Sequence, residues 1–203
     1  MDNLKIFCIT NKQSSFLEKL NLNLVGVGKN DFPKIYLNTK KGENIQEKES
    51  YYSELTFHYW LWKNDLKNYN EDDWIGFCQK RRFWLQNDQQ KINNFSDLNN
   101  HILKNVPKKW LQNESIICSP IKVNQVRKMK MLKRGWKNLI KDPSIFIDQK
   151  KQNLKLQFDM YHGYDVLSKA ISVMDTKDRS DFLYYVNTKN EFNPNIMCIS
   201  KKI

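Results

Sequence analysis

The chain has 203 residues, enough for one domain with a substantial core, and its 40% hydrophobic and 13% aromatic content excludes a disordered polypeptide. No run approaches the roughly 20 apolar residues of a membrane span, and the start MDNLKIFCIT lacks the pattern of a secretory signal, so we expect a cytoplasmic protein. The net charge of +12 suits nucleic acid, an anionic membrane or a phosphorylated small molecule as partner, and equally a Lys- and Asn-biased composition, so it decides nothing alone.

The first third of the chain contains short apolar runs and one long helical pattern. Residues 4–10 are a predicted strand, SSFLEKLNL is a short helix capped by Ser14 or Ser15, and NLVGVG and KIYLN are extended pieces. A longer helix is expected over about residues 47–67, where apolar residues recur at three- and four-residue intervals: Tyr52, Leu55, Tyr59, Trp62 and Leu66. Because Phe57, Trp60 and Leu61 make its other side apolar too, we expect this helix to be buried nearly all round. An alternative use of its aromatic residues is stacking on a ligand.

The rest of the chain continues the alternation of strands and helices. Strands are predicted at 74–78, 115–118 and 196–200, and helices in SDLNNHILKNV, with Ser96 as its cap, and at about 154–175 and 178–187. This order favours an α/β fold with a largely parallel sheet. We see no internal repeat, and residues 142–153 are the only plausible linker, so we expect a single domain over residues 1–203.

The four cysteines each lie in a short apolar run, in IFCIT, IGFCQ, IICSP and IMCIS. None forms a C-x-x-C pair, so a zinc site or a thioredoxin-like motif is not indicated. We predict four buried, reduced thiols on the strands of one sheet.

The segment WIGFCQKRRFW, residues 74–84, places Lys80, Arg81 and Arg82 directly after a core strand, and Lys12 follows the first strand. In open α/β sheets, ligands bind beyond the carboxyl ends of the strands, so these cations are expected to converge on a crevice. Arg suits pyrophosphate because its planar fork forms bidentate, charged hydrogen bonds. The alternative is a salt bridge from Arg81 or Arg82 to a buried Glu54 in the long helix, and both roles are compatible.

Several stretches together resemble the domain found in capsular and exopolysaccharide biosynthesis glycosyltransferases, a family of GT-A type long catalogued as a domain of unknown function. IFCITNK matches its strand and Thr-His-Lys, with Asn11 at the His, and GENIQEKESYYSELTFHYWLWKN matches its Gly-Asp-Asn-Ile, Tyr-Cys-Glu-Leu-Thr and Tyr-Trp-x-Trp-Lys-Asn. IGFCQKRRFW matches its Gly-Leu-x-His-Tyr-Arg-Arg-Tyr-Phe, with Gln79 and Lys80 at the His-Tyr, and MYHGYDVL and NPNIMCISKK match two later segments. The E-L-T-x-x-Y-W-x-W-K-N block is the most specific of these.

The resemblance implies a GT-A-like, Rossmann-like fold that moves a hexose from a nucleotide sugar, expected to be UDP-linked, to a saccharide or lipid-linked saccharide acceptor. It also implies a further helix after the last motif, beyond Ile203. Residues expected to hold the donor are Thr10, Asn11, Lys12, Asn44, Lys80, Arg81, Arg82 and Asn195, with Glu54 as structural support. Gln79 in place of His removes an acid–base group there, which favours the alternative of a catalytically inactive, sugar- or nucleotide-binding relative.

The candidates for catalysis are Asp159, His162 and Asp165, because a transfer with inversion needs a group that takes the acceptor hydroxyl proton. His162 and Asp165 are three residues apart and are predicted to share one helix face. The plainer interpretation is that His162 is a capping or core-edge residue.

No Asp-x-Asp occurs in the sequence, although many GT-A enzymes hold a divalent ion with that motif, and Asp72-Asp73 precedes a strand rather than following one. We therefore predict no metal ligands and no required divalent cation, with Lys80, Arg81 and Arg82 in its electrostatic role.

Residues 122–141 carry eight Lys or Arg and no acid, interleaved with Val123, Val126, Met129 or Met131, and Trp136. This pattern predicts peripheral contact with an anionic membrane at the inner face of the plasma membrane, the alternative being a solvated basic face. The rival function from another class is nucleic-acid binding. No helix-turn-helix, zinc-finger or RNP-like pattern supports it, so we predict no nucleic-acid partner.

Overall fold

The computed structural model describes residues 3–87 and 91–202, and the chain divides into two compact units. Unit 1 comprises Met1–Cys118 and Asn195–Ile203, and unit 2 comprises Ser119–Pro194. Unit 2 is therefore inserted into the sequence of unit 1 just before its last strand. Among the described residues, no helix combines the length and apolar character needed to cross a bilayer.

Unit 1 is built on a six-stranded sheet with the order β3-β2-β1-β4-β8-β5. Its strands are β1 (Leu4–Thr10), β2 (Asn23–Gly26), β3 (Leu37–Asn38), β4 (Trp74–Gln79), β5 (Ser115–Ile117) and β8 (Cys198–Lys201). The first four strands are parallel, and β8 runs antiparallel to both β4 and β5. The expected α/β architecture with a mostly parallel central sheet flanked by helices is confirmed.

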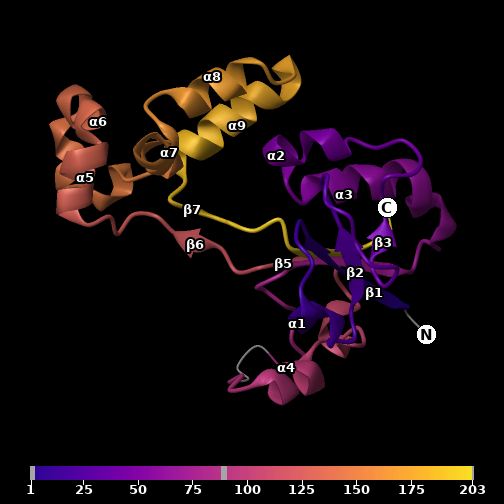
Figure 1. Cartoon of the computed structure of the whole chain (residues 1–203). Coiled ribbons are helices and arrows are strands. Elements are labelled where there is room, and N and C mark those ends of the chain that lie inside the picture. Colours follow the sequence, from indigo (N-terminus) through magenta and orange to yellow (C-terminus); the bar gives the residue numbers. More distant parts are fainter. Residues whose placement is uncertain (1–2, 88–90, 203) are drawn as a thin grey trace. The chain divides into compact units, whose positions relative to one another are not determined.

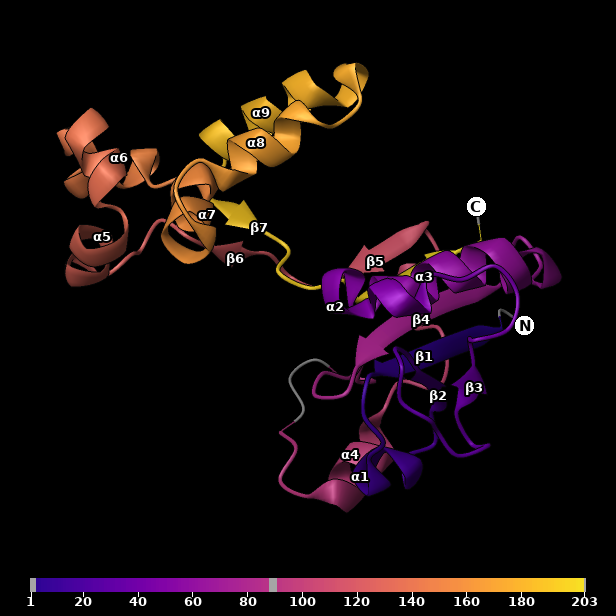
Figure 2. The same cartoon turned by 45° about the horizontal axis from the view of Figure 1, so that its top comes forward.

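Both faces of this sheet are covered by helices, which Figure 2 shows most clearly. Helices α1 (Ser15–Glu18) and α4 (Phe95–His101) lie on one face, and α2 (Glu49–Tyr52) and α3 (Leu55–Trp60) lie on the other. Side chains alternate accordingly along β1, because Ile6 and Cys8 join the core under α1 and α4 while Phe7 and Ile9 join the core under α3. Ser14 caps α1 as predicted, whereas α4 is capped by Asn94 and not by Ser96.

The long helix expected over residues 47–67 is interrupted. It consists of η1 (Gln46–Lys48), α2, α3, the π-helical turn η2 (Leu61–Asp65) and η3 (Leu66–Asn68), with a break at Ser53, whose φ is +49°. Burial all round was wrong: Phe57, Trp60 and Leu61 pack on the sheet, while Tyr52, Leu55 and Trp62 are exposed. Both sides of the pattern are apolar, so periodicity alone could not identify the side that faces the sheet.

Unit 2 is mainly helical (Figure 1). Its helices are α5 (Lys128–Arg134), α6 (Trp136–Lys141), η5 (Pro143–Phe146), η6 (Gln149–Lys151), α7 (Leu154–His162), α8 (Val166–Ser172) and α9 (Thr176–Thr188), and a small ribbon pairs β6 (Ile121–Lys122) with β7 (Glu191–Phe192). The helix predicted over 154–175 breaks at Gly163, whose φ of +108° is disfavoured for residues with a side chain. Residues 142–153, predicted to be a linker loop, contain the short helices η5 and η6.

The cysteine prediction is largely confirmed. Cys8 on β1 and Cys78 on β4 are paired in register and buried, and Cys198 begins β8. Cys118 lies one residue beyond β5, and it is half-buried, as is Cys198. All four are free thiols.

Candidate functional site

The carboxyl ends of β1 and β4 meet at one edge of the sheet. The two strands are parallel neighbours, and Ile9 is paired in register with Gln79. Lys12, two residues after β1 ends at Thr10, and Lys80–Arg82, directly after β4, therefore leave the sheet side by side. This is the edge at which open α/β sheets bind ligands, so it is the candidate site.

A tight turn explains why an apolar strand ends in three cations. The Gln79 amide donates to the Arg82 carbonyl at 3.2 Å, and the Arg82 amide donates back to the Gln79 carbonyl at 3.1 Å. Lys80 and Arg81 form the tip of this turn, and all three cations are exposed. The Trp84 indole then donates to the Phe77 carbonyl at 2.9 Å and returns the chain to the core. The turn thus lifts the cations out of the interior while both of its ends stay anchored.

A carboxylate–amide–cation relay joins the two strand ends. The Asn11 side-chain Nδ2 donates to Glu49 Oε1 at 3.1 Å, and Lys80 Nζ donates to Asn11 Oδ1 at 3.4 Å. Gly28 borders this relay with a φ of +86°, and a Cβ there would lie 3.2 Å from the Glu49 carboxylate oxygen. A residue with a side chain would be strained at this position by its φ and would have to displace the Glu49 side chain slightly.

A second relay of the same kind lies across the turn. Gln79 Nε2 donates to Glu54 Oε1 at 3.3 Å, and an Arg82 Nη1 donates to Gln79 Oε1 at 3.3 Å and also to Asn195 Oδ1. The predicted direct salt bridge from Glu54 to Arg81 or Arg82 was wrong. Glu54 is half-buried and accepts from the Ser53 hydroxyl at 2.6 Å, and the Gln79 amide separates it from Arg82.

The two relays orient cations without neutralising them. In the described part of the chain, no carboxylate lies within 4.0 Å of the amino or guanidinium nitrogens of Lys12, Lys80, Arg81 or Arg82. Each carboxylate instead fixes an amide, whose oxygen then faces the cation. The edge consequently presents four positive charges that no contacting carboxylate cancels, which is the electrostatic setting for an anion such as a diphosphate.

The side chains of two other residues predicted to hold the donor form hydrogen bonds with nearby backbone groups. The Thr10 hydroxyl donates to the Lys12 carbonyl at 2.7 Å and accepts from the Lys12 amide at 3.2 Å, which fixes the chain as it leaves β1. The Asn44 side chain donates to the carbonyls of Lys40 and Gly42 at 3.1 and 2.9 Å. Thr10 therefore positions Lys12 at the edge, while Asn44 closes the loop before η1.

The three catalytic candidates belong to unit 2. Asp159 is buried, accepts from Lys155 Nζ at 2.9 Å, and accepts from the backbone amide of Asp165 at 2.9 Å. Asp165 lies 3.7 Å from the same Lys155, and a hydrogen bond from Ser168 holds the pKa of its carboxyl below the ordinary value. Both aspartates are thus engaged in holding the turn between α7 and α8.

His162 is the last residue of α7, and its ring packs on Phe158 with centroids 5.1 Å apart. It is exposed, and neither of its ring nitrogens has a hydrogen-bond partner among the described residues. The prediction that it shares one helix face with Asp165 was wrong, because Gly163 ends α7 and Asp165 belongs to the start of α8 with a φ of +65°.

Sequence reasoning missed two residues beside the site, Glu49 and His58. His58 stacks on Phe77 at 3.9 Å, and its buried Nε2 has no partner among the described residues. Burial lowers the pKa of His58 to about 4, and nearby Glu54 opposes that shift. The spacing of four residues between Glu54 and His58 was the available signal, because it places both on one side of a helix.

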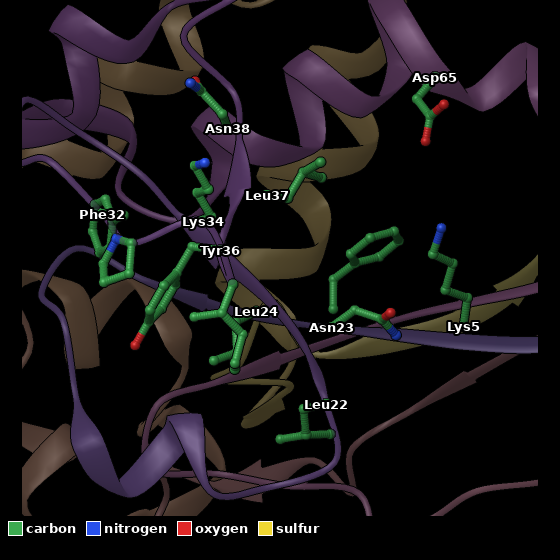
Figure 3. A pocket seen from close by; sticks show the side chains of 13 residues that line it. Lys5, Leu22, Asn23, Leu24, Phe32, Lys34, Tyr36, Leu37, Asn38 and Asp65 are labelled. Atoms are coloured by element: carbon green, nitrogen blue, oxygen red, sulfur yellow. The ribbon is translucent and has the colours of Figure 1, made fainter.

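A cavity of about 600 Å³ beside β2 and β3 is an alternative candidate site in unit 1 (Figure 3). Its lining includes Lys5, Lys34 and Asp65, and Lys5 points toward Asp65 across it. None of the predicted site residues lines it. It borders the amino-terminal part of β1, away from the carboxyl ends where such sheets bind ligands, so the cation-bearing edge is the stronger candidate.

The described residues do not fit a divalent-ion site of the GT-A kind. No group of three or more His, Cys, Asp or Glu side chains comes together in that part of the chain. The two carboxylates nearest the edge, Glu49 and Glu54, each accept a hydrogen bond from an amide. No step of the proposed chemistry is therefore assigned to a metal ion.

Comparisons with known proteins bear on the fold and on the family. A search of curated proteins gives no match. Among solved structures, the chain is similar to the apo structure of WbbM, a bifunctional glycosyltransferase, with a TM-score of 0.62 and 17% identity. The match covers 99% of this chain and 34% of that chain, so this chain spans about a third of its length. The fold is thus that of a domain in a glycosyltransferase. The pattern of one family matches residues 5–203, and the chain accordingly belongs to the family described as Domain of unknown function (DUF4422).

Proposed function

We propose that this protein is a glycosyltransferase that transfers a hexose from a UDP-linked donor to a saccharide acceptor in polysaccharide biosynthesis. The observation that carries the proposal is the edge where β1 and β4 end, with four cations that contact no carboxylate in the described chain. The shared fold with a glycosyltransferase supports the same function. The nucleotide and the pathway follow from the family resemblance of the motifs.

In the proposed reaction, the bond between the anomeric carbon and the diphosphate oxygen breaks, and the acceptor hydroxyl oxygen forms a bond to that carbon. The electron pair of the broken bond goes to the leaving diphosphate, which gains negative charge. Arg81 and Arg82 stabilise this charge with guanidinium hydrogen bonds, and Lys12 and Lys80 add positive potential. Arg82 is held in place by Gln79 and Asn195, so little reorganisation is needed as the charge develops.

The proton of the acceptor hydroxyl must pass to a base. Of the three candidates in unit 2, Asp159 is bound to Lys155 and to a backbone amide, and Asp165 contacts Ser168 and Lys155. His162 is exposed, and its nitrogens make no hydrogen bond among the described residues. Of these three predicted candidates, His162 is the one whose side chain is not already engaged in a hydrogen bond in the described chain, and UDP release by His162→Asn tests it, with the equally conservative His101→Asn on α4 as the control.

The experiment that tests the proposal is UDP binding by calorimetry, followed by UDP release from a panel of UDP-sugars with and without chelator. The wild-type protein should bind UDP and release it from at least one donor, with activity retained in chelator. Lys80→Gln and Arg81→Gln should each weaken UDP binding by about tenfold, a loss typical of one charge-assisted hydrogen bond.

The matched control is Lys67→Gln, which removes an exposed cation of η3 away from the edge. It should leave UDP binding unchanged. UDP binding with no release from any donor or acceptor would identify an inactive binding relative. Equal weakening by Lys67→Gln and Lys80→Gln would show general charge attraction and contradict a site at this edge.

A further inference from the structure

Helices α5 and α6 of unit 2 carry an exposed apolar stripe. Met129, Leu132, Trp136 and Ile140 recur at intervals of three and four residues, and they are 64%, 47%, 51% and 71% exposed. Isolated exposed apolar residues are common on protein surfaces, but here two neighbouring helices each present a pair, with Met129 and Leu132 on α5 and Trp136 and Ile140 on α6, on either side of Gly135. None of these four side chains belongs to a hydrophobic core cluster of the described residues.

The opposite side of the same two helices already packs into unit 2. Met131 is fully buried with Leu156 and Met160 of α7, and Gly135 and Leu139 lie on this inner side. The helices therefore have two apolar sides, and only one is used by the fold. Of the apolar residues predicted to interleave with the cations, Val123 is buried, and so is Met131, whereas its alternative Met129 and Trp136 are exposed.

Cations that lack ion-pair partners flank the stripe. Residues 122–141 contain eight Lys or Arg and no acid, and none of these eight lies within 4.0 Å of a carboxylate in the described chain. Several rest on aromatic rings instead: Lys130 Nζ lies 3.9 Å from the Tyr161 ring centroid, and Lys141 Nζ lies 5.2 Å from that of Tyr164. Such contacts hold the cations without neutralising them.

The same segment also borders a cavity of about 320 Å³ whose charged lining is wholly positive, with Lys122, Arg127 and Lys130 beside Gln157 and Tyr161. A pocket of this composition suits a phosphate group. Both features favour an anionic partner, and the aliphatic stripe favours one with an apolar interior. A nucleic acid has the negative charge, but it has no apolar interior that would bury Met129, Leu132 and Ile140.

We propose that the α5–α6 stripe docks on an anionic lipid bilayer. Met129, Leu132, Trp136 and Ile140 enter the boundary between head groups and acyl chains, and the flanking lysines contact the lipid phosphates. The lysine stems extend along the apolar surface while their amino groups stay at the phosphate level. This surface is independent of the transferase proposal, and its test does not require activity.

The test is co-sedimentation of the full chain with vesicles of phosphatidylcholine alone or mixed with phosphatidylglycerol. Binding is expected only with the anionic lipid, and it should fall as salt is raised. The double variant Lys133→Gln with Lys137→Gln should bind roughly thirtyfold more weakly, because each lysine contributes about fivefold and the two effects multiply. Trp136→Ser with Ile140→Ser should weaken it by more than about tenfold through lost apolar burial. Trp136 fluorescence should shift to the blue on binding.

Matched controls come from the same unit. Val173→Ser removes a side chain that is 84% exposed outside the stripe, and Lys169→Gln removes an exposed cation of α8. Both should bind like the wild type. All of these positions are at the surface, so melting temperatures should stay unchanged and confirm folding.

Three results would overturn the proposal. One is the absence of binding to anionic vesicles, and another is binding that the stripe variants do not weaken. The third is salt-sensitive binding to duplex DNA that is lost with Lys133→Gln and Lys137→Gln but kept with Trp136→Ser and Ile140→Ser, which would identify a nucleic-acid surface instead.

Discussion

The edge of β1 and β4 in unit 1 and the turn between α7 and α8 in unit 2 arrange cations and carboxylates in opposite ways. At the edge in unit 1, an amide stands between carboxylate and cation, with Asn11 between Glu49 and Lys80 and Gln79 between Glu54 and Arg82. In unit 2, Lys155 contacts Asp159 directly at 2.9 Å. The residue types are similar, but the interposed amide changes what the cation can do.

A direct ion pair cancels both charges, and in unit 2 the Asp159 side chain is fully buried, so its charge must be compensated inside the fold. An amide between the two groups orients the cation through hydrogen bonds, and the cation keeps its positive charge, which faces the solvent. A cation that contacts a carboxylate is neutralised inside the fold, whereas a cation that contacts an amide stays available to a ligand. The group in direct contact therefore matters more than the presence of acids nearby.

The largest expected effect is on the direct pair. Lys155→Met leaves a carboxylate buried without its partner, which typically costs about 3–5 kcal/mol of unfolding free energy. Urea denaturation at neutral pH measures it. The counterpart in unit 1, Lys80→Met, should change stability by less than about 0.5 kcal/mol because Lys80 is exposed and contacts only an amide. Equal losses in the two variants would remove the distinction between the units.

The next effect concerns the guanidinium groups at the edge of unit 1. Arg81→Lys and Arg82→Lys keep the charge but lose the planar fork, and loss of one donor to a developing oxyanion typically costs about 3 kcal/mol, roughly a hundredfold in rate. UDP release with chelator present measures it, and at least one of the two variants should show the full loss. Arg134→Lys on α5 is the matched control. Full activity in both edge variants, or complete dependence on added Mg²⁺ or Mn²⁺, would rule out the proposed clamp.

The central sheet was predictable because its main strands are short apolar runs that are buried on both faces of the sheet. Every strand of the parallel part of the sheet except the two-residue β3 contains such a run, and β1 alternates Ile6 and Cys8 with Phe7 and Ile9 between the two cores. The break at Ser53 and the exposed face of α3 were not predictable, because apolar residues on both sides of a helix give no indication of which side packs. Gly163 was visible in the sequence, but its positive φ, which ends α7, depends on the tertiary fold.

The cations of the candidate site were predicted from the sequence, but the hydrogen bonds that hold them in place were not. Lys12 and Lys80 through Arg82 could be placed because parallel strands end at the same edge, a rule that needs only the strand assignment. The hydrogen bond from Asn11 to Glu49 joins residues that are 38 positions apart in the sequence, and the one from Gln79 to Glu54 joins residues that are 25 positions apart. The sequence alone does not show that these side chains meet. Asn11 was included by resemblance alone, and Gln79 was regarded only as a lost His.

The third prediction concerns how each unit treats a buried ionisable side chain. Unit 2 pairs Asp159, whereas unit 1 keeps His58 neutral, because burial lowers its pKa to about 4 from an ordinary 6.5. The unfolded chain then binds more protons than the folded one between these values, so the stability present above pH 6.5 is lost as pH falls toward 4. The free energy of unfolding should drop by about 2 kcal/mol from pH 7.5 to pH 5 through this residue.

Urea denaturation of His58→Phe at the two pH values isolates this contribution. Its stability should depend less on pH than that of the wild type, by about that amount. His162→Asn, at the exposed end of α7, is the control and should follow the wild type. A His58→Phe variant with unchanged pH dependence would mean that His58 is not held neutral by burial.

The smallest expected effect comes from converting one arrangement into the other. Arg82 donates to the Asn195 side-chain oxygen, so Asn195→Asp places a carboxylate in direct contact with the guanidinium at almost no change in volume. The edge of unit 1 would then resemble the Lys155–Asp159 pair. Stability should be unchanged or slightly higher, since a partly exposed pair contributes at most about 1 kcal/mol. UDP affinity should nevertheless fall by about tenfold, because the new charge cancels part of the potential that attracts the diphosphate.

Asn21→Asp adds the same charge at an exposed site before β2 and should leave affinity unchanged. If calorimetry gives equal UDP affinity for Asn195→Asp and the wild type, Arg82 does not face the diphosphate, whatever the other cations do.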